Sequence, residues 1–87
     1  MDLNALRTQI NEIDSQIITL LADRQRIVRQ ISKLKRAENK AVYDPKREEE
    51  MRTARAEMAA ELGIDASKID KIFDLIIDWS RSIQQDL

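Results

Sequence analysis

An uninterrupted apolar stripe near the N-terminus most constrains what this chain can fold into. Hydrophobic residues recur at alternating steps of four and three, with one arginine at a stripe position: Leu6, Ile10, Ile13, Ile17, Leu20, Arg24, Ile27, Ile31 and Leu34. This is the spacing of a helix that buries one face against another helix. Because no proline or glycine occurs between residues 3 and 36, the stripe predicts a single helix roughly 50 Å long.

A helix of this length does not fit inside a compact chain of 87 residues. A globular domain of that size has a radius of gyration of about 12 Å, so much of the helix would protrude with its apolar stripe in water. A second copy of the chain is the simplest cover, since most soluble oligomers are two-fold symmetric. The sequence therefore predicts a homo-oligomer, most simply a homodimer with its long helices side by side.

The rest of the chain favours further helices. With one glycine, one proline and 3% aromatic residues, the composition suits long helices better than a sheet. Asp2 and Asp65 are candidate N-caps, Asp44-Pro45 predicts the start of a second helix, and Gly63 predicts its end. We expect one all-α domain over residues 1–87, with helices at about 3–36, 45–62 and 66–86.

The two shorter helices differ in their expected apolar faces. The face of the second helix is thin and rich in alanine: Met51, Ala54, Met58 and Leu62. The third helix has a fuller stripe, which includes one serine: Ile69, Ile72, Phe73, Ile76, Ile77, Ser80, Ile83 and Leu87. We expect the second helix to pack closely through its face while burying little surface.

Composition also excludes several classes of function. The chain has no cysteine and no histidine, which removes disulfides, thiol nucleophiles and the commonest metal ligands, so we expect no metal and no cofactor. Its 15 basic and 16 acidic residues give a net charge of -1, which leaves no overall field to attract nucleic acid or an anionic membrane. No signal peptide or long apolar run is present, so we expect a soluble, cytoplasmic protein.

Polar residues interrupt or flank all of these apolar stripes. They are Arg24 and Lys35 on the first helix, Asp44, Arg47 and Glu48 around the start of the second, and Ser80 and Gln84 on the third. Each has an ordinary structural explanation. An arginine in a helical seam can specify an oligomer, charged residues can belong to a solvated face, and a serine can be a small packing residue.

The combination of these residues is more informative than any one of them. A buried guanidinium cannot lose its proton and needs an anion beside it. Packing of the helices would bring fixed cations, a carboxylate and neutral donors to one point, which suits a small dianion that bears a hydroxyl group. Arg7 lies about 25 Å along the axis from Arg24, so it could join such a pocket only from a partner chain.

The same polar and apolar positions resemble a known family over nearly the whole chain. The matching segments are Leu6-Arg7-x-x-Ile10, Ile13-Asp14, Leu20-Leu21-Ala22-Asp23-Arg24, Lys33-Leu34-Lys35, Val42-x-Asp44-Pro45-x-Arg47-Glu48 and Ile72-Phe73-x-Leu75-Ile76-Ile77-x-x-Ser80-x-x-x-Gln84. They are similar to the all-helical, bacterial type II class of chorismate mutase. The resemblance implies an intertwined homodimer that rearranges chorismate to prephenate in phenylalanine and tyrosine biosynthesis.

The resemblance also implies a role for each polar residue. Arg24 and the partner subunit's Arg7 would bind the substrate carboxylates, Lys35 and Gln84 would donate to the ether oxygen, and Glu48 would accept from the ring hydroxyl. Asp44, Arg47 and Ser80 would line the same pocket. A Claisen rearrangement is unimolecular and needs no base, nucleophile or metal, which explains how a chain without histidine or cysteine could be an enzyme. It requires conformer selection and stabilisation of charge on the ether oxygen.

Two other functions are compatible with the pattern. Isochorismate-pyruvate lyases share the fold, the arginines, the lysine and the glutamine, but they tend to lack a carboxylate where this chain has Asp44 and Glu48. A non-catalytic helical dimer would more often place leucine at positions 24 and 80, because buried polar groups cost free energy. Some members of the resembled family depend on a partner synthase, and the sequence leaves that possibility open.

Overall fold

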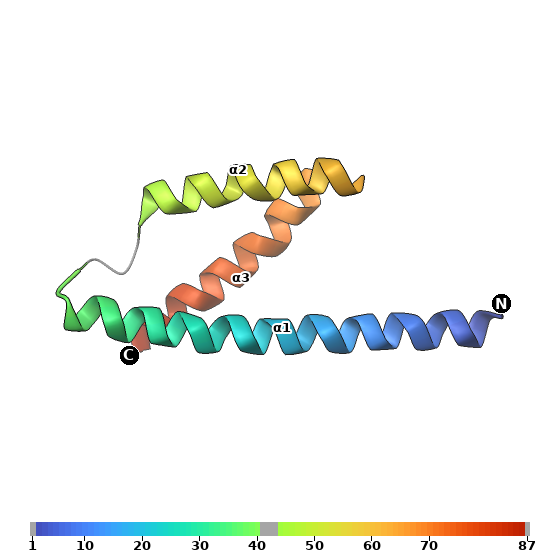
Figure 1. Cartoon of the computed structure of the whole chain (residues 1–87), viewed down its shortest axis with the longest axis horizontal. Helices are drawn as coiled ribbons and strands as arrows, with labels where there is room; N and C mark the ends of the chain where they lie inside the picture. The colour runs from blue at the N-terminus through green and yellow to red at the C-terminus, as the bar shows by residue number, and fades with distance from the viewer. Residues whose placement is uncertain (1, 41–43, 87) are drawn as a thin grey trace.

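The computed structural model describes residues 2–40 and 44–86, and within these ranges the regular structure is entirely helical. Its elements are α1 (Leu3–Ala37), α2 (Pro45–Leu62) and α3 (Ala66–Asp86), shown in Figure 1. The predicted all-α class is confirmed, and the predicted helix bounds are correct to within one residue. Val42 of the family motif and Leu87 of the third stripe lie outside the described residues.

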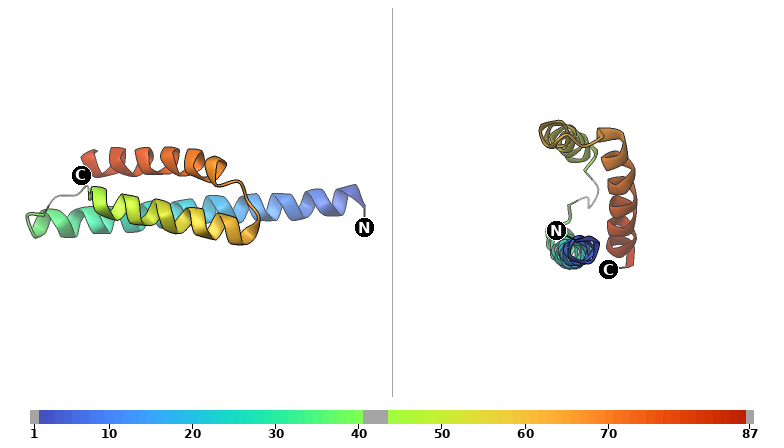
Figure 2. Two further views of the ribbon diagram at one scale, coloured as in Figure 1. Left: turned by 90° about the horizontal axis from the view of Figure 1, so that it is seen from above. Right: turned by 90° about the vertical axis from the view of Figure 1, so that its right-hand side faces the viewer.

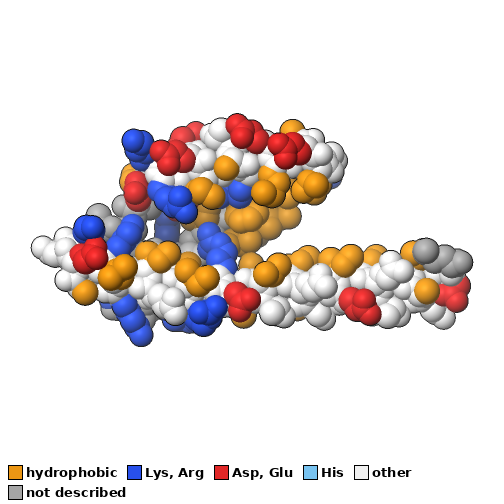
Figure 3. Space-filling model, viewed as in Figure 1, with side chains coloured by type: hydrophobic (Ala, Val, Ile, Leu, Met, Phe, Trp, Pro, Cys, Tyr) orange, Lys and Arg blue, Asp and Glu red, His pale blue; other side chains and the backbone are white. Residues whose placement is uncertain are grey.

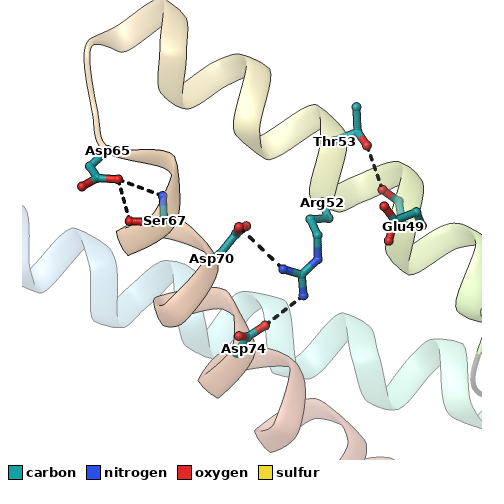
Figure 4. Close-up of polar contacts among 7 residues, drawn as sticks. All are labelled: Glu49, Arg52, Thr53, Asp65, Ser67, Asp70 and Asp74. Atoms are coloured by element: carbon teal, nitrogen blue, oxygen red, sulfur yellow. Dashed lines mark hydrogen bonds and ion pairs between the residues drawn. The ribbon is translucent and has the colours of Figure 1, made fainter.

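Local capping explains where the helices begin and end. Backbone N–H groups in the first turns of α1 and α2 donate to the carboxylates of Asp2 and Asp44, at 2.7 Å and 3.2 Å. Asp65 accepts a similar bond of 2.9 Å at the start of α3, which is visible in Figure 4. Gly63 ends α2 at φ 70°, a left-handed backbone conformation that glycine adopts without a steric penalty. The predicted caps are therefore confirmed.

The helices form an open trough with α3 as its base. α3 packs against both α1 and α2, whereas α1 and α2 do not pack against each other within the described part of the chain. The end-on view in Figure 2 shows α1 and α2 apart, with α3 joining them along one side. The radius of gyration is 16.2 Å, well above the value of about 12 Å for a compact domain, and the longest extent is 55 Å.

The long apolar stripe of α1 remains uncovered in this single chain. Ile10, Ile17 and Leu20 are 58%, 50% and 65% exposed, although a buried face was predicted from their spacing. Figure 1 shows the N-terminal half of α1 extending past the other helices, and Figure 3 shows a row of hydrophobic side chains along it. The chain therefore does not cover its own stripe, as expected from the length of the helix, while the predicted dimer remains a prediction.

α3 instead covers another face of α1, which the sequence did not single out. Gln25, Val28 and Ser32 are spaced three and four residues apart and are 2%, 8% and 0% exposed. In the described residues, the buried hydrophobic side chains are those of Val28 and Ala59. Such a small core indicates that one chain alone buries too little apolar surface for a stable globular domain.

The predicted face of α2 is wrong for contacts within this chain. Met58 and Leu62 are 61% and 67% exposed, and α2 packs on α3 around Ala59, which is 3% exposed. Arg52 and Arg55 lie on the same face as Ala59, since they precede it by seven and four residues. A small alanine permits close approach of the two helices, and long arginine side chains cover the surface beside it. The large hydrophobic residues of α2 therefore lie on a face that is exposed in the single chain, whereas the contact with α3 uses another face.

Ion pairs strengthen this contact between α2 and α3. The Arg52 guanidinium lies 3.6 Å from a carboxylate oxygen of Asp70 and 3.1 Å from one of Asp74 (Figure 4). The two carboxylates lie one turn apart on α3, so a single arginine from α2 bridges both. Because these side chains are partly exposed, we expect each pair to contribute less than about 1 kcal/mol to stability.

Candidate active site

The contact between Arg24 and Ser80 joins the predicted polar residues of α1 and α3. Nη1 of Arg24 donates to Oγ of Ser80 at 2.6 Å, and Ser80 is 7% exposed. Ser80 is the small residue in the α3 stripe, so α1 can approach α3 closely at this point. The structure thus brings together two residues that are far apart in the sequence. Arg24 interrupts the apolar stripe of α1, and Ser80 interrupts that of α3.

Nearby charges from α2 act on the same arginine. Partial burial lowers the pKa of the Arg24 guanidinium, the negative charge of Glu48 raises it, and the positive charge of Arg55 lowers it again. Arginine stays protonated at any pH at which a protein is folded, so Arg24 remains a fixed cation. These interactions bring α2 into the site, because both Glu48 and Arg55 lie close enough to influence Arg24.

A groove between α2 and α3 adjoins these residues. Its volume is about 540 Å³, and its lining includes Glu48, Arg55, Ile77 and Arg81. This volume lies within the range of about 300–1,000 Å³ that is usual for small-molecule sites. In Figure 3, lysine and arginine side chains gather between α1 and α2 at the end where the C-terminal half of α1 faces the start of α2. The groove itself carries charges of both signs, because its lining includes Glu48, Glu49, Asp74 and Asp78 together with Arg52, Arg55 and Arg81.

Arg55 is a residue of this region that sequence reasoning missed. Its guanidinium carbon lies 4.5 Å from the centroid of the Phe73 ring, a distance typical of a cation–π contact. Its Nε atom is buried and has no hydrogen-bond partner among the residues that the structure describes. The available signal was its position four residues before the small residue Ala59, on the face of α2 that packs against α3.

Lys35 and Gln84 are held at one end of the contact between α1 and α3. Both residues are half-buried. Arg36, which follows Lys35, donates from Nη2 to the backbone carbonyl oxygen of Gln84 and so ties the C-terminal ends of α1 and α3 together. The two predicted donors to an ether oxygen therefore lie at the same end of the helix pair.

The remaining predicted residues are exposed in the single chain. Asp44 uses its carboxylate to cap α2, and Arg47 lies in the first turn of that helix. Arg7 lies near the start of α1, in the half that extends beyond α2 and α3 (Figure 1). Within residues 2–40 and 44–86, no hydrogen bond or ion pair joins any of these side chains to Arg24, so the contribution of these three residues to the site remains a prediction.

Two further properties concern metals and membranes. Among the described residues, no group of three or more acidic side chains is placed to hold a metal ion. No helix in the same part of the chain is long and apolar enough to cross a membrane.

Comparison with known proteins identifies the family. The model of the family "Chorismate mutase type II" matches residues 6–85. A bifunctional chorismate mutase/prephenate dehydratase of Buchnera aphidicola subsp. Acyrthosiphon pisum is 33% identical over 93% of this chain, which spans 21% of that protein. The corresponding Escherichia coli K12 protein is 32% identical over 98% of this chain and 22% of its own length.

A relative of similar size is also found. The chorismate mutase of Methanocaldococcus jannaschii is 26% identical over 95% of this chain and 84% of its own length. No solved structure matches. Because the family match covers almost the entire sequence, including every candidate site residue named above, the chain belongs to the chorismate mutase type II family.

Proposed function

We propose that this protein catalyses the rearrangement of chorismate to prephenate, a step toward phenylalanine and tyrosine. The observation that carries the proposal is the Arg24–Ser80 contact between α1 and α3, with the charge of Glu48 acting on the same arginine. Family membership and the similar-sized relative named chorismate mutase support the same activity. The unimolecular reaction also suits a chain that contains no histidine and no cysteine.

The proposed mechanism relies on positioning and fixed charge. Arg24 and the partner subunit's Arg7 bind the two substrate carboxylates and so favour the compact conformer in which the reacting carbons meet. Lys35 and Gln84 donate to the ether oxygen, where negative charge develops as the C–O bond breaks. Glu48 accepts a hydrogen bond from the ring hydroxyl, while Asp44, Arg47 and Ser80 complete the wall.

The required energy is compatible with these groups. A millionfold acceleration corresponds to about 8 kcal/mol of transition-state stabilisation. One preorganised donor to a developing oxyanion contributes about 3–4 kcal/mol, so Lys35 and Gln84 together approach this value. Conformer selection by the arginines supplies the remainder.

The proposed active form is an intertwined homodimer with two equivalent sites. The exposed stripe of α1 and the small core of the single chain support this assembly. In it, the N-terminal half of α1 from one subunit lies in the trough of the other and delivers Arg7. Each chain acts as one catalytic domain over residues 1–87, without metal or cofactor, and we place the enzyme in the cytoplasm.

A direct assay tests the function. Purified protein is added to chorismate, loss of the diene absorbance is followed, and the product is identified by chromatography. Formation of prephenate by the parent and not by Arg24→Ala supports both reaction and site. Release of pyruvate from isochorismate, without prephenate from chorismate, would identify a lyase instead. No turnover of either substrate by a folded dimer would refute the proposed activity.

A further inference from the structure

Gln25 is the most deeply buried polar residue that touches the candidate active site. It follows Arg24 on α1, it is 2% exposed, and its side chain contacts Ser80 of α3. Its Oε1 atom lies 3.3 Å from Oγ of Ser80, which is the residue that receives the hydrogen bond from Arg24. Gln25 therefore reaches Arg24 indirectly, through a hydroxyl that both residues contact.

The Ser80 hydroxyl is the centre of this network. It accepts from Arg24 Nη1 at 2.6 Å, and its single proton can go to Gln25 Oε1 at 3.3 Å or to the backbone carbonyl of Ile76 at 3.0 Å. The bond to Ile76 is local to α3 and common for a serine within a helix. The bond to Gln25 crosses to α1, and it holds the hydroxyl in the interface where Arg24 meets it.

The network is also electrically neutral apart from Arg24. A carboxylate in place of Ser80 or Gln25 would satisfy the guanidinium and compete with an anionic substrate. A hydroxyl supported by an amide orients the guanidinium while leaving its positive charge available. This property distinguishes Arg24 from Arg52, whose charge is already shared between Asp70 and Asp74.

The position of Gln25 has a cost in stability. Its Nε2 atom is buried and has no hydrogen-bond partner in the described residues. Leaving a buried donor unsatisfied is unfavourable, and an apolar side chain of equal length would avoid that penalty. Packing alone therefore gives no reason for an amide at this position.

We propose that Gln25 is a positioning residue of the active site. Its Oε1 fixes Ser80, and Ser80 in turn holds the Arg24 guanidinium in the orientation that meets a substrate carboxylate. The proposal rests on the proposed mutase function, because the effect on turnover is its main consequence.

The same face of α1 supplies a matched control. Ser32 lies seven residues after Gln25, is 0% exposed, and also has a buried side-chain oxygen without a partner in the part of the chain that is described. It makes no hydrogen bond to the predicted site residues. Removing the polar group of Ser32 therefore tests the effect of an unsatisfied buried atom without disturbing the network around Arg24.

The experiment compares Gln25→Met with Ser32→Ala. Methionine keeps the length of the side chain and removes the amide. For Gln25→Met we expect kcat/KM to fall about three- to tenfold, the effect of one neutral hydrogen bond, with no decrease in Tm. For Ser32→Ala we expect kcat/KM to stay within about twofold of the parent, again with no decrease in Tm.

A double-mutant cycle separates a positioning role from a packing role. If Gln25 acts through Ser80, then Gln25→Met should change kcat/KM less than about twofold in a Ser80→Ala background, because the shared partner is absent. Multiplicative losses in the double variant would overturn the proposal. So would a Gln25→Met variant whose kcat/KM remains within about twofold of the parent. If Gln25→Met does not fold, Gln25→Asn replaces it, since its shorter amide cannot reach Ser80.

A spectroscopic measurement distinguishes failure of this proposal from failure of the proposed function. If the parent does not turn over chorismate, the function is refuted, but the positioning role can still be measured by NMR. The Nη–H signals of Arg24, assigned by their loss in Arg24→Lys, should exchange slowly with water in the parent, because Nη1 donates to Ser80, and much faster in Gln25→Met. An unchanged exchange rate would show that Gln25 does not hold the guanidinium.

Discussion

Removal of Arg24 gives the sharpest expectation for catalysis. In Arg24→Ala, the substrate carboxylate that the guanidinium would meet is left without its cation, while the negative charge of Glu48 remains beside the site. Truncating one partner of a buried charged pair costs about 2–5 kcal/mol. We take at least about 3 kcal/mol here, because Arg24 is already partly desolvated and oriented by Ser80. This predicts at least a hundredfold loss of kcat/KM.

The fold should tolerate this substitution. Arg24→Ala removes a charged hydrogen bond to Ser80 and the attraction of Glu48, but it also removes the cost of a partly buried cation that Arg55 repels. These effects oppose each other, so helix content by circular dichroism should be unchanged and Tm should move little. A loss of activity without unfolding would then report on the site itself.

The assay follows chorismate consumption by the parent, Arg24→Ala and Arg52→Ala. Arg52 is the matched control, because it is also an arginine and lines the groove, but its charge is held by Asp70 and Asp74. We expect Arg52→Ala to keep kcat/KM within about threefold of the parent, with some loss of stability. A loss below fivefold for Arg24→Ala would refute the assignment, as would equal losses for both variants.

Three further predictions concern pH and assembly. Because the Gln84 amide donates at any pH, the turnover of the parent should be nearly constant from about pH 6 to 9, and a steep fall in this window would contradict the assigned donor. Gln84→Glu should be active only on the acid side, where a carboxylic acid can donate. Hydrogen bonds from Ser67 lower the pKa of the Asp65 carboxyl in the folded protein. The stability that Asp65 contributes is therefore present above its unfolded pKa of about 4 and is lost as the pH falls through the lower folded pKa. Between about pH 5 and 2, the Tm of Ser67→Ala should therefore fall less than the Tm of the parent. Ile17 lies half-exposed on the α1 stripe, and burying the rest of its side chain in a dimer would contribute about 1 kcal/mol per chain. We therefore expect Ile17→Asp to be monomeric by light scattering. Ile18 is 67% exposed and lies off the stripe, so Ile18→Asp should remain dimeric.

Local sequence signals were sufficient for the helices themselves. The bounds of α2 follow from Asp44-Pro45 at its start and Gly63 at its end, and each signal acts on its own backbone neighbours. The length of α1 follows from an unbroken period without proline or glycine, and the mismatch between that length and the size of the chain left its stripe exposed. Arg24 and Ser80 were found because each stands as a polar exception within an apolar stripe.

Only the tertiary structure decided which faces of the helices meet. A hydrophobic stripe shows that a face is buried by something, but it does not identify the partner; the stripe of α1 is left uncovered by its own chain. The contacts that do form use residues that look unremarkable in sequence, namely Gln25 and Ser32 on α1 and Arg55 and Ala59 on α2. Small residues allow helices to approach, and long polar side chains cover apolar surface with their stems. Neither effect produces a hydrophobic period, so the packing of α3 and the surroundings of Arg24 became visible only in three dimensions.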